Sequence, residues 1–310
     1  GLSALRMRGY LRMNSSMKLY RILFIVAALS VAWVSDAQIR TGAYEDLYDS
    51  ETVAAIKGHV RELSSAMLEG RKAGSEGEKL AAEYIEGLFT AYDIDLVSPS
   101  GGELFGVKKE NGDTLTSRNV VGFVPGYDKS LRDRYIVVAA RLDNMGTQTM
   151  TIDGRPHEKI FYGANGNASG LSMMMELAGR IKTNEVLFRR SVLFIALGAS
   201  SETYAGAWYF LNRSFPHVGN IVAMINLDMV GRSGRDNVMQ FYTAEANVEM
   251  LEIVNELSGR ALSMTPKYTP VDHFPSDHRN FYEKGIPVAF FTSGTHRDFH
   301  TVRDTPDKLD

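Results

Sequence analysis

Five short apolar runs, separated by helical patterns, constrain the fold of this chain more than any other feature. The runs carry no charged residue, and they span residues 120–124, 135–140, 192–197, 221–227 and 287–292. Apolar residues at helical spacing occur over 52–68, 76–92, 168–181 and 248–257. Unbroken apolar runs are typical of strands covered on both faces. The pattern therefore predicts an α/β fold, a three-layer α/β/α sandwich around a mixed, largely parallel central sheet.

The N-terminal segment has the composition of an export signal. Basic residues precede an apolar run over 22–34, and small residues stand three and one positions before a predicted cleavage site after Ala37. The run is too short to cross a bilayer as a helix. We expect residues 1–37 to be an upstream extension plus signal peptide, with Met17 as the suspected true start. Residues 38–310 would then form a single domain, exported to the periplasm or secreted.

The charge and the lack of cysteine exclude several classes of partner and site. The chain has 34 Lys and Arg against 37 Asp and Glu, and removal of residues 1–37 would leave 29 against 36, a net charge of −7. This charge disfavours nucleic acid and anionic membrane surfaces as partners. Because the chain has no cysteine, thiolate metal ligands, a cysteine-linked lipid anchor and disulfides are excluded.

Polar residues follow four of the predicted strands. In parallel sheets, ligands bind outside the carboxyl ends of the strands, so these residues are the candidates for function. They are Arg141 and Asp143 after the run 135–140, Ser200, Ser201 and Glu202 after 192–197, Asp228 after 221–227, and the segment from His296 to Asp304 after 287–292.

Six segments carry a resemblance to a known family. They are GRKAGSEGEKLAAEYI (70–85), SRNVVGFVPG (117–126), GANGNASG (163–170), INLDMVGR (225–232), SDHRNFYEKGIPVAFF (276–291) and FHTVRDTPDKLD (299–310). In this order they resemble the zinc-dependent aminopeptidases of peptidase family M28, relatives of glutamate carboxypeptidase and glutaminyl cyclase. The resemblance runs from about Val53 to the C-terminus. It implies an α/β sandwich with two zinc ions at the strand ends, where metal-activated water and a Glu base remove N-terminal residues from peptides.

The same resemblance implies that most of the metal site has been replaced. Family ligands fall on five positions, of which Asp228 and His300 keep a ligand, whereas Arg141 replaces a His, Gly166 the bridging Asp and Ser201 a Glu. The general-base position is Ser200, so no catalytic residue is intact. The positions expected to support the site or line the cleft are Asp143, Asn167, Glu202, Asp277, His278 and Asp304.

The remaining ligands do not favour zinc. A catalytic zinc ion needs about three protein ligands, and here each metal would keep one. The permanently charged guanidinium of Arg141 would also repel a dication. Our hypothesis is that Arg141 lies in the vacated site and pairs with Asp228 in place of a metal, with Asp143 as a further candidate partner. We expect no cofactor, or zinc if the chain is active after all.

Three alternatives stay open at this point. A shift of one residue in the alignment would bring Glu202 into the ligand position of Ser201. The spacing of His296 and His300 resembles a metal-binding pair on a helix, but this segment is expected to be a loop. The run Ser276-Asp277-His278 could serve a serine hydrolase with Ser200 or Ser201, yet the chain lacks a Gly-x-Ser-x-Gly elbow there.

Two functions therefore compete. The first is an inactive, exported member of the peptidase family that keeps its cleft to bind a peptide or a protein. The second is an active metallo-aminopeptidase with a non-standard metal site. Replacement of the base and of three ligands favours the first function.

Overall fold

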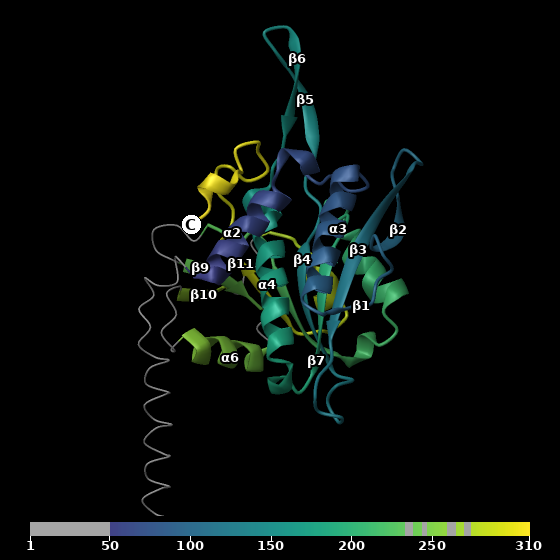
Figure 1. The fold of residues 1–310 in the computed structure, drawn as a ribbon, viewed down its shortest axis with the longest axis vertical. Helices are drawn as coiled ribbons and strands as arrows, with labels where there is room; N and C mark the ends of the chain where they lie inside the picture. Colours follow the sequence, from purple (N-terminus) through teal and green to yellow (C-terminus); the bar gives the residue numbers. More distant parts are fainter. Residues whose placement is uncertain (1–49, 233–237, 244–246, 259–264, 270–273) are drawn as a thin grey trace, which may run out of the picture. The chain divides into compact units, whose positions relative to one another are not determined.

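The computed structural model describes residues 50–232, 238–243, 247–258, 265–269 and 274–310 (Figure 1). Residues from Glu51 to Asp310 belong to one compact unit. The predicted signal peptide and its upstream extension lie outside the described residues. Within those residues, we find no helix with the length and apolar composition needed to cross a membrane.

The described strands form one large mixed sheet and one separate hairpin. The large sheet has nine strands in the described chain, in the order β1-β3-β7-β4-β8-β11-β9-β10, with β2 paired to β3. The strands are β1 (Asp95–Leu96), β2 (Glu103–Lys108), β3 (Thr114–Val124), β4 (Tyr135–Arg141), β7 (Ser191–Leu197), β8 (Ile221–Leu227), β9 (Val238–Tyr242), β10 (Thr265–Thr269) and β11 (Val288–Thr292). The hairpin consists of β5 (Thr147–Ile152) and β6 (Arg155–Ile160).

The centre of the large sheet is parallel, as the sequence predicts. Strands β7, β4, β8 and β11 run in the same direction, while β3 is antiparallel to β7 and β9 is antiparallel to β11. Every residue of β7 is buried, in agreement with a strand covered on both faces. The prediction of a mixed, largely parallel sheet is confirmed, and all four central strands end at the same edge.

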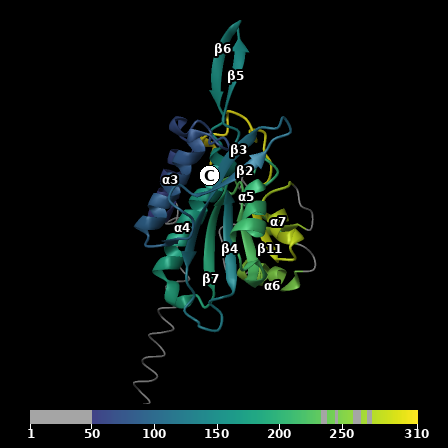
Figure 2. The same ribbon diagram turned by 90° about the vertical axis from the view of Figure 1, so that its right-hand side faces the viewer.

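Helices cover both faces of this sheet. Helices α2 (Glu51–Leu63), α3 (Glu76–Ala91) and α4 (Ser169–Thr183) lie on one face, and α5 (Ala205–Tyr209) and α7 (His278–Glu283) lie on the other (Figures 1 and 2). Helix α6 (Val248–Ser258) packs beside β9 and β11. Short helical turns occupy Ala66–Leu68, Ala164–Ala168, Glu185–Leu187, Phe210–Ser214, Val218–Asn220 and Pro306–Lys308. The layers are those of the predicted sandwich.

Local hydrogen bonds explain where helix α3 begins and where helix α2 ends. Helix α3 starts at a Ser75 cap, whose hydroxyl oxygen accepts a hydrogen bond from the Glu78 amide at 3.3 Å. The prediction of one helix over 52–68 is wrong, because α2 stops at Leu63. The Ser64 hydroxyl donates to the Val60 carbonyl at 2.5 Å, and such side-chain bonds compete with helix continuation.

The sequence patterns missed six described strands at the edges of the sheet and outside it. Strands β1, β2, β9 and β10 and the hairpin β5–β6 are short or polar, and they lack the unbroken apolar runs of the buried strands. Strands β1, β9 and β10 pair with strands that are distant in sequence, whereas β2 pairs with β3 and β5 pairs with β6 across short connections.

Candidate functional site

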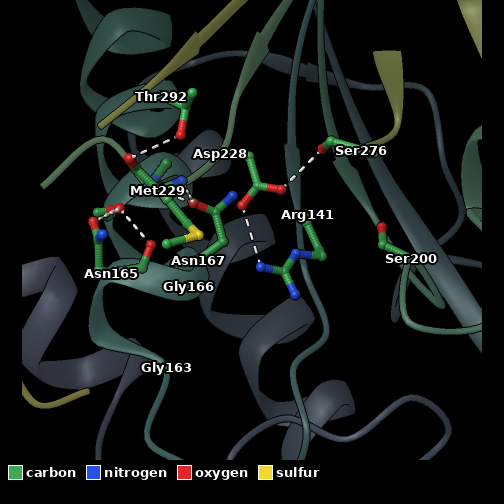
Figure 3. A network of polar contacts seen from close by, with 12 residues as sticks. Arg141, Gly163, Asn165, Gly166, Asn167, Ser200, Asp228, Met229, Ser276 and Thr292 are labelled. Carbon is green, nitrogen blue, oxygen red and sulfur yellow. Dashed lines mark hydrogen bonds and ion pairs between the residues drawn. The ribbon is translucent and has the colours of Figure 1, made fainter. Parts of the chain in front are cut away.

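The carboxyl ends of β4, β7 and β8 bring the predicted site residues together (Figure 3). Arg141 is the last residue of β4, Ser200 lies in the turn after β7, and Asp228 follows β8 directly. The loop with Gly166 precedes α4 and closes the site from the side. Sequence and topology agree on this location.

Arg141 and Asp228 form a buried ion pair. Arg141 Nη2 donates to Asp228 Oδ1 at 3.2 Å, and the two side chains are 10% and 4% exposed. Burial by itself lowers the pKa of Arg141, but the carboxylates of Asp228 and Asp143 outweigh it and raise the pKa overall. Arg141 Nε has no hydrogen-bond partner among the described residues. The predicted pair with Asp228 is confirmed, and Arg141 carries its charge inside the site.

Asp228 uses its second oxygen as well. Ser276 Oγ donates to Asp228 Oδ2 at 2.9 Å, and Asn226 Nδ2 donates to Ser276 Oγ at 2.9 Å. Two different groups therefore compensate the buried carboxylate, a cation and a hydroxyl. The sequence offers Ser276 as part of a possible hydrolase motif, whereas its contact with Asp228 depends on the fold.

Gly166, where the resemblance implies a bridging carboxylate, lies next to the side chains of Arg141 and Asp304. A Cβ added at Gly166 would lie 3.5 Å from Arg141 Nη2 and 3.6 Å from Asp304 Oδ2. Asp304 in turn accepts hydrogen bonds from the Asn165 amide at 3.0 Å and the Gly166 amide at 2.9 Å. The guanidinium thus stands beside the position from which the carboxylate is missing, and Asp304 holds the loop in place.

Asp143 braces the turn that carries the two serines. Its oxygens accept hydrogen bonds from the Ser200 amide at 2.7 Å, the Ser201 amide at 3.0 Å and the Ser201 hydroxyl at 2.5 Å. Burial raises the pKa of Asp143, although these bonds and the charge of Arg141 act against the shift. Arg141 interacts with Asp143 through its charge, but among the described residues its direct hydrogen bond goes to Asp228.

The Ser200 hydroxyl donates to Asp277 rather than standing ready as a nucleophile. The distance from Ser200 Oγ to Asp277 Oδ2 is 2.7 Å. Burial is the main cause that raises the pKa of Asp277, to about 7. The ring of His278 stacks on Phe290 with 4.5 Å between ring centroids. Since the hydroxyl proton points to a carboxyl group, the arrangement differs from that of a Ser–His hydrolase.

The two histidines of the C-terminal segment have different surroundings. His296 lies between Asn165 Nδ2 at 3.1 Å and Arg232 Nη1 at 2.9 Å, whereas the His300 ring stacks on Phe299 at 3.8 Å between centroids. The pKa of His300 is lowered, first by loss of solvation around the ring and then by the charge of Arg141, while part of the residue stays accessible to solvent. The segment is a turn and not a helix, as expected.

The other predicted cleft residues support the backbone. Asn167 Nδ2 donates to the Leu227 carbonyl at 2.8 Å, and Asn167 Oδ1 accepts from the Met229 amide at 2.9 Å, so this side chain clamps the end of β8. Glu202 is half-buried, and its amide donates to the Ala199 carbonyl at 3.1 Å. The serines, and not Glu202, are the residues of this turn that Asp143 and Asp277 hold.

Arg71 is a structural residue whose role the sequence did not single out. Its side chain is fully buried, and it donates to the carbonyls of Leu63, Leu142, Tyr162 and Gly163. Burial lowers the pKa of Arg71 to about 10. This side chain connects the turn before α3 to the end of β4 and to the loop of Gly166. The GRKAG segment was a signal for it, but the burial was not visible in the sequence.

These residues do not fit a zinc pair. Within the described parts of the chain, no group of three or more His, Asp or Glu residues is arranged to hold a metal ion. A cation of the protein itself, Arg141, lies next to Asp228, and Gly166, where the resemblance implies the bridging Asp, has no side chain. The donor set is therefore that of a salt bridge.

Comparison with known proteins agrees with this fold. LapB from Legionella pneumophila is 23% identical, with a TM-score of 0.63 over 87% of this chain and 70% of its own. A zinc aminopeptidase from Bacillus subtilis is 17% identical, with a TM-score of 0.64 over 83% and 90%. Bacteroides thetaiotaomicron glutaminyl cyclase is 19% identical, with a TM-score of 0.61 over 83% and 91%. These likenesses show the fold. Residues 119–310 also match the family described as peptidase family M28, and the chain therefore belongs to that family.

Proposed function

We propose that this chain is an exported, non-catalytic member of peptidase family M28 that uses its cleft to bind a peptide or a protein. The observation that carries the proposal is the position of Arg141, whose guanidinium pairs with Asp228 beside Gly166. Of two positions that the resemblance assigns to metal-binding carboxylates, Asp228 is neutralised by Arg141, and Gly166 has no side chain.

Electrostatics supports the loss of metal chemistry. Two unit charges 4 Å apart interact by roughly 4 kcal/mol at an effective dielectric constant near 20, and a dication doubles that repulsion from Arg141. Ser200 cannot replace a Glu base, because its hydroxyl has an ordinary alcohol proton and already donates to Asp277. Neither water activation nor metal binding has the groups that it needs.

Binding is supported by what has been kept. The loop of Gly166, the serine turn and the end of β8 are held by buried hydrogen bonds, which their backbone amides donate to the side chains of Asp304, Asp143 and Asn167. Relatives of the same fold are named as aminopeptidases, which act on peptide N-termini. We extend this substrate class to the chain as a class of ligand.

Metal content and peptidase turnover test the first half of the proposal. Protein purified without an affinity tag is expected to hold no stoichiometric zinc and to release no nitroaniline from aminoacyl-nitroanilides. The matched variant is Arg141→His/Gly166→Asp/Ser200→Glu/Ser201→Glu, which restores the family's residues. One or two zinc ions per wild-type chain, with turnover that a chelator abolishes, would establish the active metallo-aminopeptidase instead.

Peptide capture tests the second half. A defined tryptic digest of one known protein is passed over the immobilised chain, and retained peptides are identified by mass spectrometry. Gly166→Leu should abolish retention, because its side chain enters the space beside Arg141 and Asp304, where an added Cβ makes ordinary contacts. Gly87→Ala, on the far side of α3 with nothing within 4 Å, is the control. Equal retention by both variants would contradict the use of this cleft.

We propose export because residues 1–37 have the composition of a signal peptide. The intact mass of the mature protein tests this. The mature protein recovered from the periplasm or medium is expected to begin at Gln38. A chain that keeps residues 17–37 would contradict cleavage after Ala37.

A further inference from the structure

The hairpin β5–β6 extends from the rest of the compact unit (Figures 1 and 2). Residues 148–151 and 153–158 are exposed. The base is fixed, because Asn144 Nδ2 donates to the Phe161 carbonyl at 2.8 Å and the Gly146 amide donates to Gly70 at 3.0 Å. Among the described residues, each strand of the hairpin pairs only with the other. A ribbon of two strands is marginally stable in water, and this one has two open edges.

The turn of the hairpin determines which backbone groups point outward. Residues 153–154 both have positive φ, +50° and +74°, which is the two-residue turn favoured in hairpins. This turn makes Ile152 and Arg155 a hydrogen-bonded pair. Such pairs alternate with pairs that do not bond to each other, so Thr151 and Pro156 direct their backbone groups away from the hairpin.

The two outer edges therefore differ in chemistry. Outward-directed positions are 147, 149 and 151 in β5, all threonine, and 156, 158 and 160 in β6, which are Pro, Glu and Ile. Pro156 offers no N–H group, and β6 also carries Arg155, Glu158 and Lys159. Proline and charge are the usual protection of an edge strand against pairing. Strand β5 has neither charge nor proline, so its edge is unprotected.

We infer that the outer edge of β5 pairs with the same edge of a second copy of this chain, antiparallel about a two-fold axis at Thr149. In this register Thr147 lies opposite Thr151 of the second copy, and Gln148 lies opposite Met150. Cross-strand threonine pairs are favourable, and no like charges meet. The same operation on β6 would place Glu158 opposite Glu158. Only β5 is complementary to itself, and pairing converts two marginal hairpins into one four-stranded sheet.

A disulfide across the axis tests the register. Paired backbone positions of this kind have Cα atoms about 5.5 Å apart, which is within the usual range for a disulfide. The chain has no cysteine, so Thr149→Cys introduces a single thiol per copy. Under mild oxidation this variant should become a reducible covalent dimer. Glu158→Cys, which lies directly across the hairpin from Thr149 and is equally exposed, should remain monomeric. Crosslinking of Glu158→Cys at the same rate or faster would overturn the proposal.

Sedimentation of the full chain tests the association itself. The wild type is expected to sediment at twice the mass of one chain, and Thr149→Pro at the mass of one chain. Proline there removes an outward N–H group and leaves the ladder between β5 and β6 intact. Glu158→Pro is the matched control on the other edge and should sediment as the wild type. All three proteins share the apolar run 22–34, so it cannot cause a difference between them. A monomeric wild type, or a dimer that Thr149→Pro leaves unchanged, would overturn the proposal, and the edge would then be open to a different chain.

Discussion

Arg141 shows how one residue can alter the chemistry of a whole site. The guanidinium lies 3.2 Å from Asp228 and within 3.5 Å of where a side chain at Gly166 would begin. In the proposed non-catalytic function, this guanidinium compensates the charge of Asp228 in place of a metal ion.

Removal of this cation should destabilise the fold strongly. Arg141→Ala leaves Asp228 buried without its counter-charge, and we expect the free energy of unfolding to fall by about 3–5 kcal/mol. Denaturant melts of the variant and the wild type at neutral pH measure this loss of unfolding free energy. Arg189→Ala breaks an exposed ion pair with Asp128 and should have a much smaller effect. A loss well under 1 kcal/mol for Arg141→Ala would contradict a buried, interacting pair.

Asp277 makes stability depend on pH in the direction opposite to that of a salt-bridged carboxylate. Its pKa is raised from 3.8 to about 7 in the folded chain, so between these values the folded state binds more protons than the unfolded state. The cost of ionising the buried group is absent below about pH 4 and is complete above about pH 7. Stability therefore falls as pH rises through this window.

Asp277→Asn should remove this cost. The difference in unfolding free energy, variant minus wild type, is expected to increase between pH 5 and pH 8 by up to a few kcal/mol, since one pKa unit corresponds to about 1.4 kcal/mol. Denaturant melts at both pH values measure the difference. Asp128→Asn is the control, because hydrogen bonds lower the pKa of Asp128 to about 2 and its effect should not change in this window. A constant difference for Asp277→Asn would show that the group ionises at an ordinary pKa.

At the scale of elements, close approach of α4 to the end of β8 sets the geometry of the site. A Cβ at Gly170 would lie 2.2 Å from the Leu227 carbonyl oxygen and 2.5 Å from Asn167 Oδ1. Asn167 also accepts from the Gly170 amide at 3.1 Å, which ties the helix start to the loop. The helix can therefore reach the strand only where it has no side chain.

Two glycine substitutions in helices should have opposite signs. Gly170→Ala should destabilise the fold by about 1–3 kcal/mol, because helix and strand must separate. Gly87→Ala in α3 meets nothing within 4 Å and should stabilise it by about 0.5–1 kcal/mol through helix propensity. Thermal or denaturant melts of the two variants measure the signs. Stabilisation by Gly170→Ala would mean that α4 is not held against β8.

For the whole molecule, the proposed absence of a structural metal has a direct consequence for stability. A ligand that binds the folded state raises the melting temperature, and its removal lowers it. The wild-type melting temperature is expected to be the same with and without EDTA at matched ionic strength. The fourfold variant with restored family residues, loaded with zinc, is the positive control. A drop for the wild type in EDTA would show that metal contributes to its fold.

The sequence by itself determined the layers, the central strands and the edge at which the site lies. Buried strands such as 192–197 need apolar residues on both faces, and this requirement appears directly in the local pattern. The resemblance also located Arg141, Gly166, Ser200 and Asp228 at that edge, and it predicted the pair of Arg141 with Asp228.

Only the tertiary structure decided how the site is compensated and what surrounds it. The hydrogen-bond partners of Asp143 are serines and not Arg141, Ser276 serves Asp228, and Arg71 is buried under the loop of Gly166. The open edge of β5 belongs to a local hairpin, whose register and turn the structure shows and whose strands lack an unbroken apolar run. The physical reason is the distance along the sequence between the residues that interact. Burial periodicity is encoded by neighbours in the chain, whereas these hydrogen bonds join residues 48 to 92 positions apart and depend on how separate elements pack.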